Sequence, residues 1–92
     1  MRKRRTVRAL EKAAEVFSLP SEAAGVSRVT ITGNSRAHIE NHRGLLSYAA
    51  EEISVNAGRL ILRFRGAGLE IEAMSDLELV IKGEILALEY LT

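Results

Sequence analysis

The stretch that decides the fold is residues 58–74, which read Gly-Arg-Leu-Ile-Leu-Arg-Phe-Arg-Gly-Ala-Gly-Leu-Glu-Ile-Glu-Ala-Met. Apolar residues take every second position on both sides of a glycine-rich centre, Gly66-Ala67-Gly68; they are Leu60, Leu62, Phe64, Leu69, Ile71 and Ala73. A half-buried strand requires this alternation, because successive side chains point to opposite faces of the pleat. Two such runs with a short glycine-rich connection predict a β-hairpin.

The polar positions of the same stretch favour this pairing. One predicted strand offers Arg63 and Arg65, and the other offers Glu70 and Glu72. Opposite charges that face each other across two strands contribute about 0.2–1 kcal/mol per pair. We therefore expect these four side chains to meet on the outer face of the hairpin.

Composition indicates one small domain with an aliphatic core. The chain has 92 residues, of which 47% are apolar and only 4% aromatic, and this is enough for a single core. Without cysteine, the sequence excludes disulfides and thiolate metal sites. No apolar run approaches the ~18 residues that a membrane span needs, and no apolar segment follows the basic start as it does in a secretory signal.

Charge is distributed unevenly. Residues 1–12 hold six bases and one acid, a net charge of +5, whereas the seven bases and eleven acids of residues 13–92 give −4. The chain therefore combines a basic arm with a mildly acidic body.

Residues 2–17 are predicted to form a helix. An apolar stripe with spacings of three and four residues is formed by Val7, Leu10, Ala14 and Phe17. Pro20 ends the helix, because the residue before a proline is pushed out of the α region. We divide the chain into a basic N-terminal helix or arm (1–19), a linker (20–28) and a β domain (29–92).

The β domain alternates in short runs. The expected inward residues are Val29, Ile31, Ala37, Ile39, Ile53, Val55, Leu77, Leu79 and Ile81, and a further run is Leu45-Leu46-Ser47-Tyr48. Turns are expected at Gly33-Asn34, Asn41-His42-Arg43-Gly44, Asn56-Ala57-Gly58 and Ser75-Asp76.

The last run changes phase. Ile81 and Ile85 share one parity, whereas Leu86, Leu88 and Tyr90 share the other, so a β-bulge is expected near residues 86–87. The whole pattern predicts a mainly β fold, a single antiparallel sandwich or roll of about seven short strands. A solenoid is the competing architecture, but the glycines do not follow a fixed repeat.

Histidines, carboxylates and serines offer no catalytic or metal-binding pattern. His38 and His42 lie on a predicted strand and turn, where residues four apart are well over 10 Å from each other, so we expect two surface histidines and no metal. Glu70, Glu72 and Glu78 alternate with apolar residues, as on a solvated face. Neither a nucleophile elbow nor a phosphate-binding loop is present. We expect no enzyme activity and no cofactor.

Two segments are candidates for contact with partners. The first is the turn Asn41-His42-Arg43-Gly44, where asparagine and glycine suffice to close a tight turn and Arg43 could reach an acidic partner. The second is the basic arm, whose bases are Arg2, Lys3, Arg4, Arg5, Arg8 and Lys12. Each base near an anionic membrane contributes about 1 kcal/mol. A nucleic-acid contact through this arm is the alternative, although base-stacking aromatics are scarce.

The whole sequence resembles the YabP/YqfC family of bacterial sporulation proteins, and its YqfC branch most closely. The most specific part is Ile39-Glu40-Asn41-His42-Arg43-Gly44-Leu45-Leu46. The other parts are Ser18-Leu19-Pro20, Arg28-Val29-Thr30-Ile31-Thr32-Gly33, Glu52-Ile53-Ser54-Val55, and the spaced residues from Gly58 to Tyr90. Residues 21–25 depart from the pattern, since similar proteins carry a more acidic and apolar linker there.

This resemblance implies a non-enzymatic protein of endospore formation, made in the cytoplasm of the mother cell beside a membrane-embedded sporulation partner. It implies no catalytic residue. It also gives His42 and Arg43 a role as contact residues, because a turn needs only Asn41 and Gly44. The sheet edges suggest self-association. The runner-up function is a nucleic-acid-binding module, and a small-molecule carrier is a third.

Overall fold

The computed structural model describes residues 25–92, which form six β-strands and no helix. The strands are β1 (Arg28–Thr32), β2 (Arg36–Glu40), β3 (Leu45–Ala49), β4 (Glu52–Asn56), β5 (Ile61–Met74) and β6 (Glu78–Leu91). The prediction of a mainly β fold is confirmed, with six strands in place of about seven. The predicted helix 2–17 and most of the linker lie outside the described residues.

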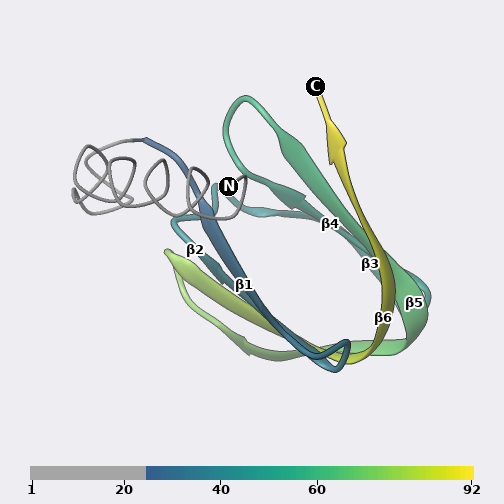
Figure 1. Cartoon of the computed structure of the whole chain (residues 1–92). Coiled ribbons are helices and arrows are strands. Elements are labelled where there is room, and N and C mark those ends of the chain that lie inside the picture. The colour runs from purple at the N-terminus through teal and green to yellow at the C-terminus, as the bar shows by residue number, and fades with distance from the viewer. Residues whose placement is uncertain (1–24) are drawn as a thin grey trace, which may run out of the picture.

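All six strands belong to one antiparallel sheet with the order β1-β2-β6-β5-β4-β3. The two long strands, β5 and β6, pair along nearly their whole length and bend together (Figure 1). The sheet is thereby folded over on itself. Its first half contains β1, β2 and the paired segments at the start of β6 and the end of β5, and its second half contains β3, β4 and the remaining segments of β5 and β6.

The predicted hairpin over residues 58–74 is wrong. Gly66-Ala67-Gly68 does not turn the chain, because these residues lie inside β5 and two of them pair with β6. The buried positions nevertheless change from even to odd residue numbers across this centre, from Phe64 to Leu69. Glycines between two alternating runs fit a bend with a bulge as well as they fit a turn. Only the pairing partner decides between the two, and that partner is distant in sequence.

The charged residues of β5 consequently have other partners. On the outer face of the second half, the side chains of Arg63 and Arg65 both lie within 4.0 Å of Glu52 and Glu89. On the first half, Glu70 lies 3.5 Å from Lys82, and Glu72 lies 2.7 Å from Arg36. The predicted arginine–glutamate pairs therefore do not form within β5, although the outward direction of these residues was correctly predicted.

Glycine makes the shared bend possible. A Cβ atom on Gly66 would overlap the backbone carbonyl of Glu84. Gly83 has a φ of +131°, and a Cβ there would lie 2.5 Å from the carbonyl oxygen of Gly68. The backbones of β5 and β6 thus approach each other more closely at the bend than side chains would permit.

Bulges accompany the bend. Arg65 pairs with Ala87 and Gly66 with Ile85, so Leu86 is an extra residue on β6. This confirms the bulge that the phase change near residues 86–87 predicted. Further register shifts lie between Ala67 and Glu70 on β5, and beyond Ile71. Bulges of this kind bend a strand and increase its twist.

Each short hairpin is attached to the bend at its tip. In the turn between β3 and β4, the carbonyls of Ala50 and Glu51 accept hydrogen bonds from the amides of Leu69 and Gly66, at 2.7 and 3.1 Å. In the turn between β1 and β2, the carbonyls of Asn34 and Ser35 accept bonds from the amides of Ile85 and Gly83, at 2.7 and 3.1 Å. Backbone groups that leave the regular ladder at the bend are satisfied in this way.

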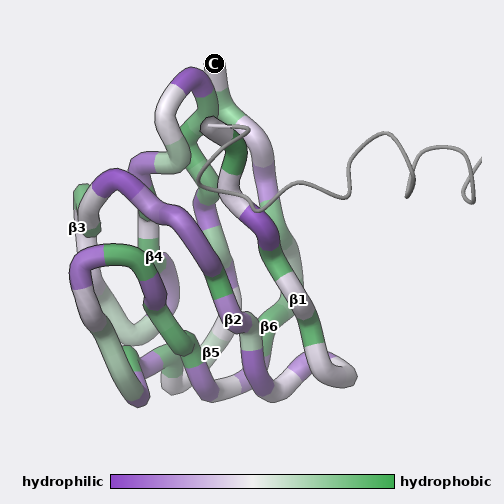
Figure 2. The backbone as a smooth tube through the Cα atoms, turned by 90° about the vertical axis from the view of Figure 1, so that its left-hand side faces the viewer, coloured by the Kyte–Doolittle hydropathy of each residue, from purple (hydrophilic) through white to green (hydrophobic). Residues whose placement is uncertain are grey.

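The core lies between the two halves. Its buried residues are Ala37, Ile39, Ile53, Val55, Leu62, Phe64, Leu69, Leu79, Ile81 and Ile85, and Figure 2 shows apolar and polar positions alternating along the strands. Most of these residues were predicted from parity. Ile31, Ala73 and Leu77 were also predicted to point inward but are exposed, because Ile31 lies on the edge strand β1, Ala73 near the end of β5 and Leu77 in the turn before β6.

We predict that Gly66→Ala destabilises the domain by about 3 kcal/mol or more, because the added methyl group must push β5 away from the Glu84 carbonyl. Urea unfolding followed by circular dichroism measures this change. Gly58→Ala is the matched control. Gly58 has a φ of +86° and open space around it, so only a backbone cost of about 1–2 kcal/mol is expected. Equal losses in the two variants would contradict the close approach at the bend.

Candidate functional site

Residues 41–44, Asn41-His42-Arg43-Gly44, form the crossover segment between the halves of the sheet. They connect the end of β2 in the first half to the start of β3 at the far edge of the second half. The predicted tight turn at these residues is wrong, because β2 and β3 are not neighbours in the sheet and the segment crosses from one half to the other. Its conformation depends on Asn41, whose φ is +62°, and on Gly44, whose φ is +125°. Asparagine tolerates the left-handed region better than most residues.

Backbone hydrogen bonds tie the crossover segment to both halves. Leu77, in the turn between β5 and β6, accepts from the amides of Asn41 and His42 at 2.6 and 3.2 Å. Asn56, at the end of β4, accepts from the amide of Arg43 at 2.7 Å and donates its own amide to the Gly44 carbonyl at 2.8 Å. The segment therefore holds together two parts of the sheet that share no strand pairing at this end.

Asn41 also fixes the chain that leads into β1. Its buried side chain donates from Nδ2 to the Val26 carbonyl at 3.0 Å, and the Ser27 hydroxyl donates to the Asn41 carbonyl at 2.7 Å. An asparagine that accepts a hydrogen bond from the amide two residues on occurs at Asn56, whose Oδ1 accepts from the Gly58 amide at 2.9 Å.

His42 is the most constrained side chain of the segment. It is only 3% exposed, so the prediction of a surface histidine is wrong at this position. Its Nε2 lies 2.8 Å from the Ser75 carbonyl, and the Gly44 amide donates to its Nδ1 at 3.0 Å. A carbonyl only accepts and an amide N–H only donates, so Nε2 carries the proton and Nδ1 does not. The ring acts as a neutral bridge between the crossover segment and the β5–β6 turn.

His38 has a different environment. Its half-exposed ring lies on the outer face of the first half, where Nε2 is 2.7 Å from the Glu78 carboxylate across the β2–β6 pair. The two histidines therefore serve separate contacts. Among residues 25–92, no three histidine or carboxylate side chains gather as a metal site would require.

The exposed part of the site is a mixed patch beside the crossover segment. Arg43, Met74, Asp76 and Leu77 are exposed, and we call these four residues the crossover surface. They line a shallow hollow of about 720 Å³ together with the buried residues of the segment. Met74 and Leu77 are 50% and 48% exposed, so the hollow presents two large apolar side chains to solvent.

The four predicted contact residues thus have different positions. Asn41 and His42 are buried, Gly44 is half-buried, and Arg43 alone points its side chain into solvent. The basic arm residues lie outside the described part of the chain. Sequence reasoning did not identify Met74 and Leu77 as candidate contact residues. Both flank the predicted Ser75-Asp76 turn, and large apolar side chains beside a turn are candidates for exposure.

Comparison with known proteins identifies a family. The model of the YabP family matches residues 23–92. Neither the search of curated proteins nor the search of solved structures found a match. No helix within residues 25–92 has the length and apolar content needed to cross a membrane.

We predict that His42→Ala destabilises the domain by about 2–4 kcal/mol, because it leaves the Gly44 amide and the Ser75 carbonyl without partners and opens a cavity. The neighbouring Arg43→Ala is the control. Its exposed side chain should contribute within about 0.5 kcal/mol. Urea denaturation compares the two, and equal stability of both variants would show that the histidine bridge is dispensable for folding.

Proposed function

Because the chain belongs to the YabP family of sporulation proteins, we propose that it acts as a non-enzymatic interaction component of spore development in the mother cell. The partner is a membrane-embedded sporulation protein, which the chain meets at the cytoplasmic side of the membrane. Within the family, we assign the chain to the YqfC branch on the strength of Glu40-Asn41-His42-Arg43-Gly44. The family has no known catalytic activity.

The observation that supports this proposal is the crossover surface. Arginine and methionine are enriched at the centres of protein interfaces, where charged side chains otherwise become rare. Here Arg43 and Met74 lie beside Leu77 on backbone that is fixed by buried hydrogen bonds. A surface that is ordered before binding loses little conformational freedom on association. The exposed residues therefore suit contact with a protein partner.

The buried residues of the motif act indirectly in this proposal. Asn41, His42 and Gly44 hold the backbone of Arg43 and the carbonyls of Ser75 and Leu77 in place. Arg43 supplies the charge that contacts the partner. In this proposal, Arg43 alone of the predicted contact motif contacts the partner, and the other three residues hold its backbone in position.

The basic arm is proposed to bring the domain to the membrane. Six bases within residues 1–12 would each contribute about 1 kcal/mol near an anionic surface. The described domain, residues 25–92, has seven bases and nine acids, so its mildly negative charge favours an orientation with the arm toward the lipid headgroups. The protein is then peripheral to the membrane.

Self-association through a sheet edge is a further proposed contact. β3 is an edge strand, and it exposes two large apolar residues, Leu46 and Tyr48. An edge strand of this kind can pair with a second copy of the chain.

To test the crossover surface, the protein is purified with its partners from sporulating cells that carry Arg43→Glu or Leu77→Ser. We expect recovery of one membrane protein to fall about tenfold, the effect of losing about 1.4 kcal/mol of binding energy, and spore formation to fall with it. The matched controls are Arg28→Glu and Leu86→Ser, which change exposed residues elsewhere. Recovery equal to that of the unaltered protein would contradict a partner contact at this surface.

A second comparison isolates the arm. Deletion of residues 1–17 should reduce recovery of the membrane protein and abolish binding to vesicles that contain anionic lipid. Binding to nucleic acid that survives ~150 mM salt would instead favour the nucleic-acid-binding function, because contact with phosphates alone weakens steeply as salt rises.

A further inference from the structure

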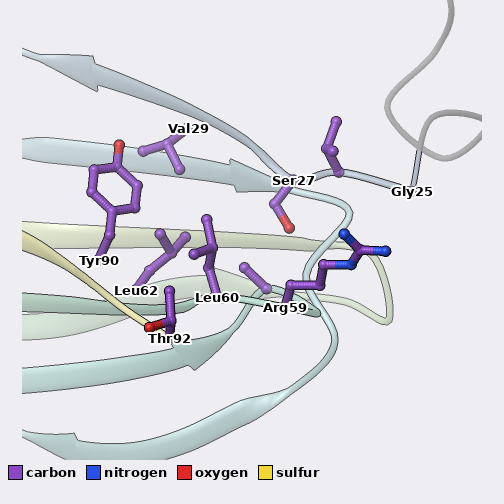
Figure 3. A pocket seen from close by; sticks show the side chains of 10 residues that line it. Gly25, Ser27, Val29, Arg59, Leu60, Leu62, Tyr90 and Thr92 are labelled. Atoms are coloured by element: carbon purple, nitrogen blue, oxygen red, sulfur yellow. The ribbon is translucent and has the colours of Figure 1, made fainter.

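An apolar groove runs along one side of the folded sheet. It has a volume of about 1000 Å³ and lies between β1 and the ends of β5 and β6. Its walls carry Val29 from β1, Leu62 from β5 and Tyr90 from β6, with Leu60 beside them. In Figure 3, Tyr90, Leu60 and Leu62 point toward the strand that carries Val29.

The groove exists because the two halves do not pair along this side. β1 pairs only with β2, and the second half of β6 pairs only with β5 among residues 25–92. The opposite side is bridged, since the Tyr48 hydroxyl accepts a hydrogen bond from the Ile71 amide at 3.2 Å. Tyr90 is aligned with the buried Leu62 and faces inward with it, yet it is 61% exposed.

We propose that the apolar side chains of residues 7–17 of the same chain occupy this groove. The stripe Val7, Leu10, Ala14 and Phe17 covers Leu62 and Tyr90, and Phe17 fills the end nearest to β1. This inference is independent of the proposed function, because it concerns how the arm is held and not what the arm binds.

The position of the arm supports this occupant. The chain outside the described residues joins the domain at Gly25, which itself lines the groove. Phe17 is eight residues away, so it can reach any point within about 27 Å of Gly25 along an extended chain. A tether this short gives an effective concentration in the millimolar range. A second copy of the chain reaches that concentration only in a very concentrated solution.

The composition of the arm also matches the groove. Phe17 is the only aromatic residue in residues 1–24, and the groove offers aliphatic side chains beside Tyr90, namely Val26, Val29, Ala57, Leu60 and Leu62. At helical spacing, Arg8 and Lys12 lie on the side opposite the apolar stripe. Docking of the stripe therefore leaves these two bases in solvent, where an anionic surface can contact them.

The test uses the full chain with Phe17→Trp, which introduces the only tryptophan. We expect the indole at position 17 to be quenched by acrylamide about threefold less than in a peptide of residues 1–24 with the same substitution, because a buried indole is shielded. Adding Tyr90→Lys in β6 or Val26→Lys just before β1, which both change residues that line the groove, should restore quenching to the peptide value. Leu86→Lys is the control, since Leu86 is 68% exposed on the same strand but outside the groove.

Three results would overturn the proposal. The first is quenching in the full chain equal to that in the peptide. The second is protection that survives both wall variants, while circular dichroism shows them folded. The third is protection that disappears when the protein is diluted a hundredfold, which would identify a second copy as the occupant. Protection that is independent of concentration and is lost in both wall variants supports the proposal.

Discussion

The close approach of two backbones at the bend of β5 and β6 is the constraint on which the rest of the structure depends. Gly66 lies against the carbonyl of Glu84, and Gly83 lies against that of Gly68. Because no side chain separates the strands there, both can change direction together and remain paired. The same two strands then serve both halves of the sheet. A domain with 68 described residues and no disulfide obtains in this way a core that is covered on both sides.

Such a folded sheet is closed firmly at the bend and needs a separate connection at its open end. The crossover segment provides it. Its backbone bonds to Leu77 on one half and to Asn56 on the other, and His42 adds a bridge of two hydrogen bonds away from water. Buried polar groups stabilise a structure only when all their partners are present. Asn-His-Arg-Gly is therefore first a structural motif, and its exposed arginine is the part available for binding.

Parity along the strands was enough to predict the fold class and most of the core. The alternating runs around Ile39, Val55 and Ile81 point inward as expected, and the phase change at Leu86 correctly indicated a bulge. The glycine-rich centre of β5 was misread because local sequence cannot distinguish a turn from a bend that is held by a distant strand. His42 was misplaced for a related reason. One of its two partners, the Ser75 carbonyl in the β5–β6 turn, is remote in sequence, and nothing near position 42 indicates burial. Local sequence therefore did not predict the contacts that form when the sheet folds over itself. It did predict the inward positions that follow from alternation along a strand.

The position of β6 affects how the protein is made. It is the last of the six described strands in chain order, yet it lies in the middle of the sheet, between β2 and β5. Until Glu78 and the residues after it have left the ribosome, the nascent chain can form only the β1–β2 hairpin and the meander of β3, β4 and β5, each with an edge that lacks its neighbour. Exposed edges are sites of wrong pairing. The sheet can therefore be completed only after β6 has left the ribosome, because β6 joins β2 to β5.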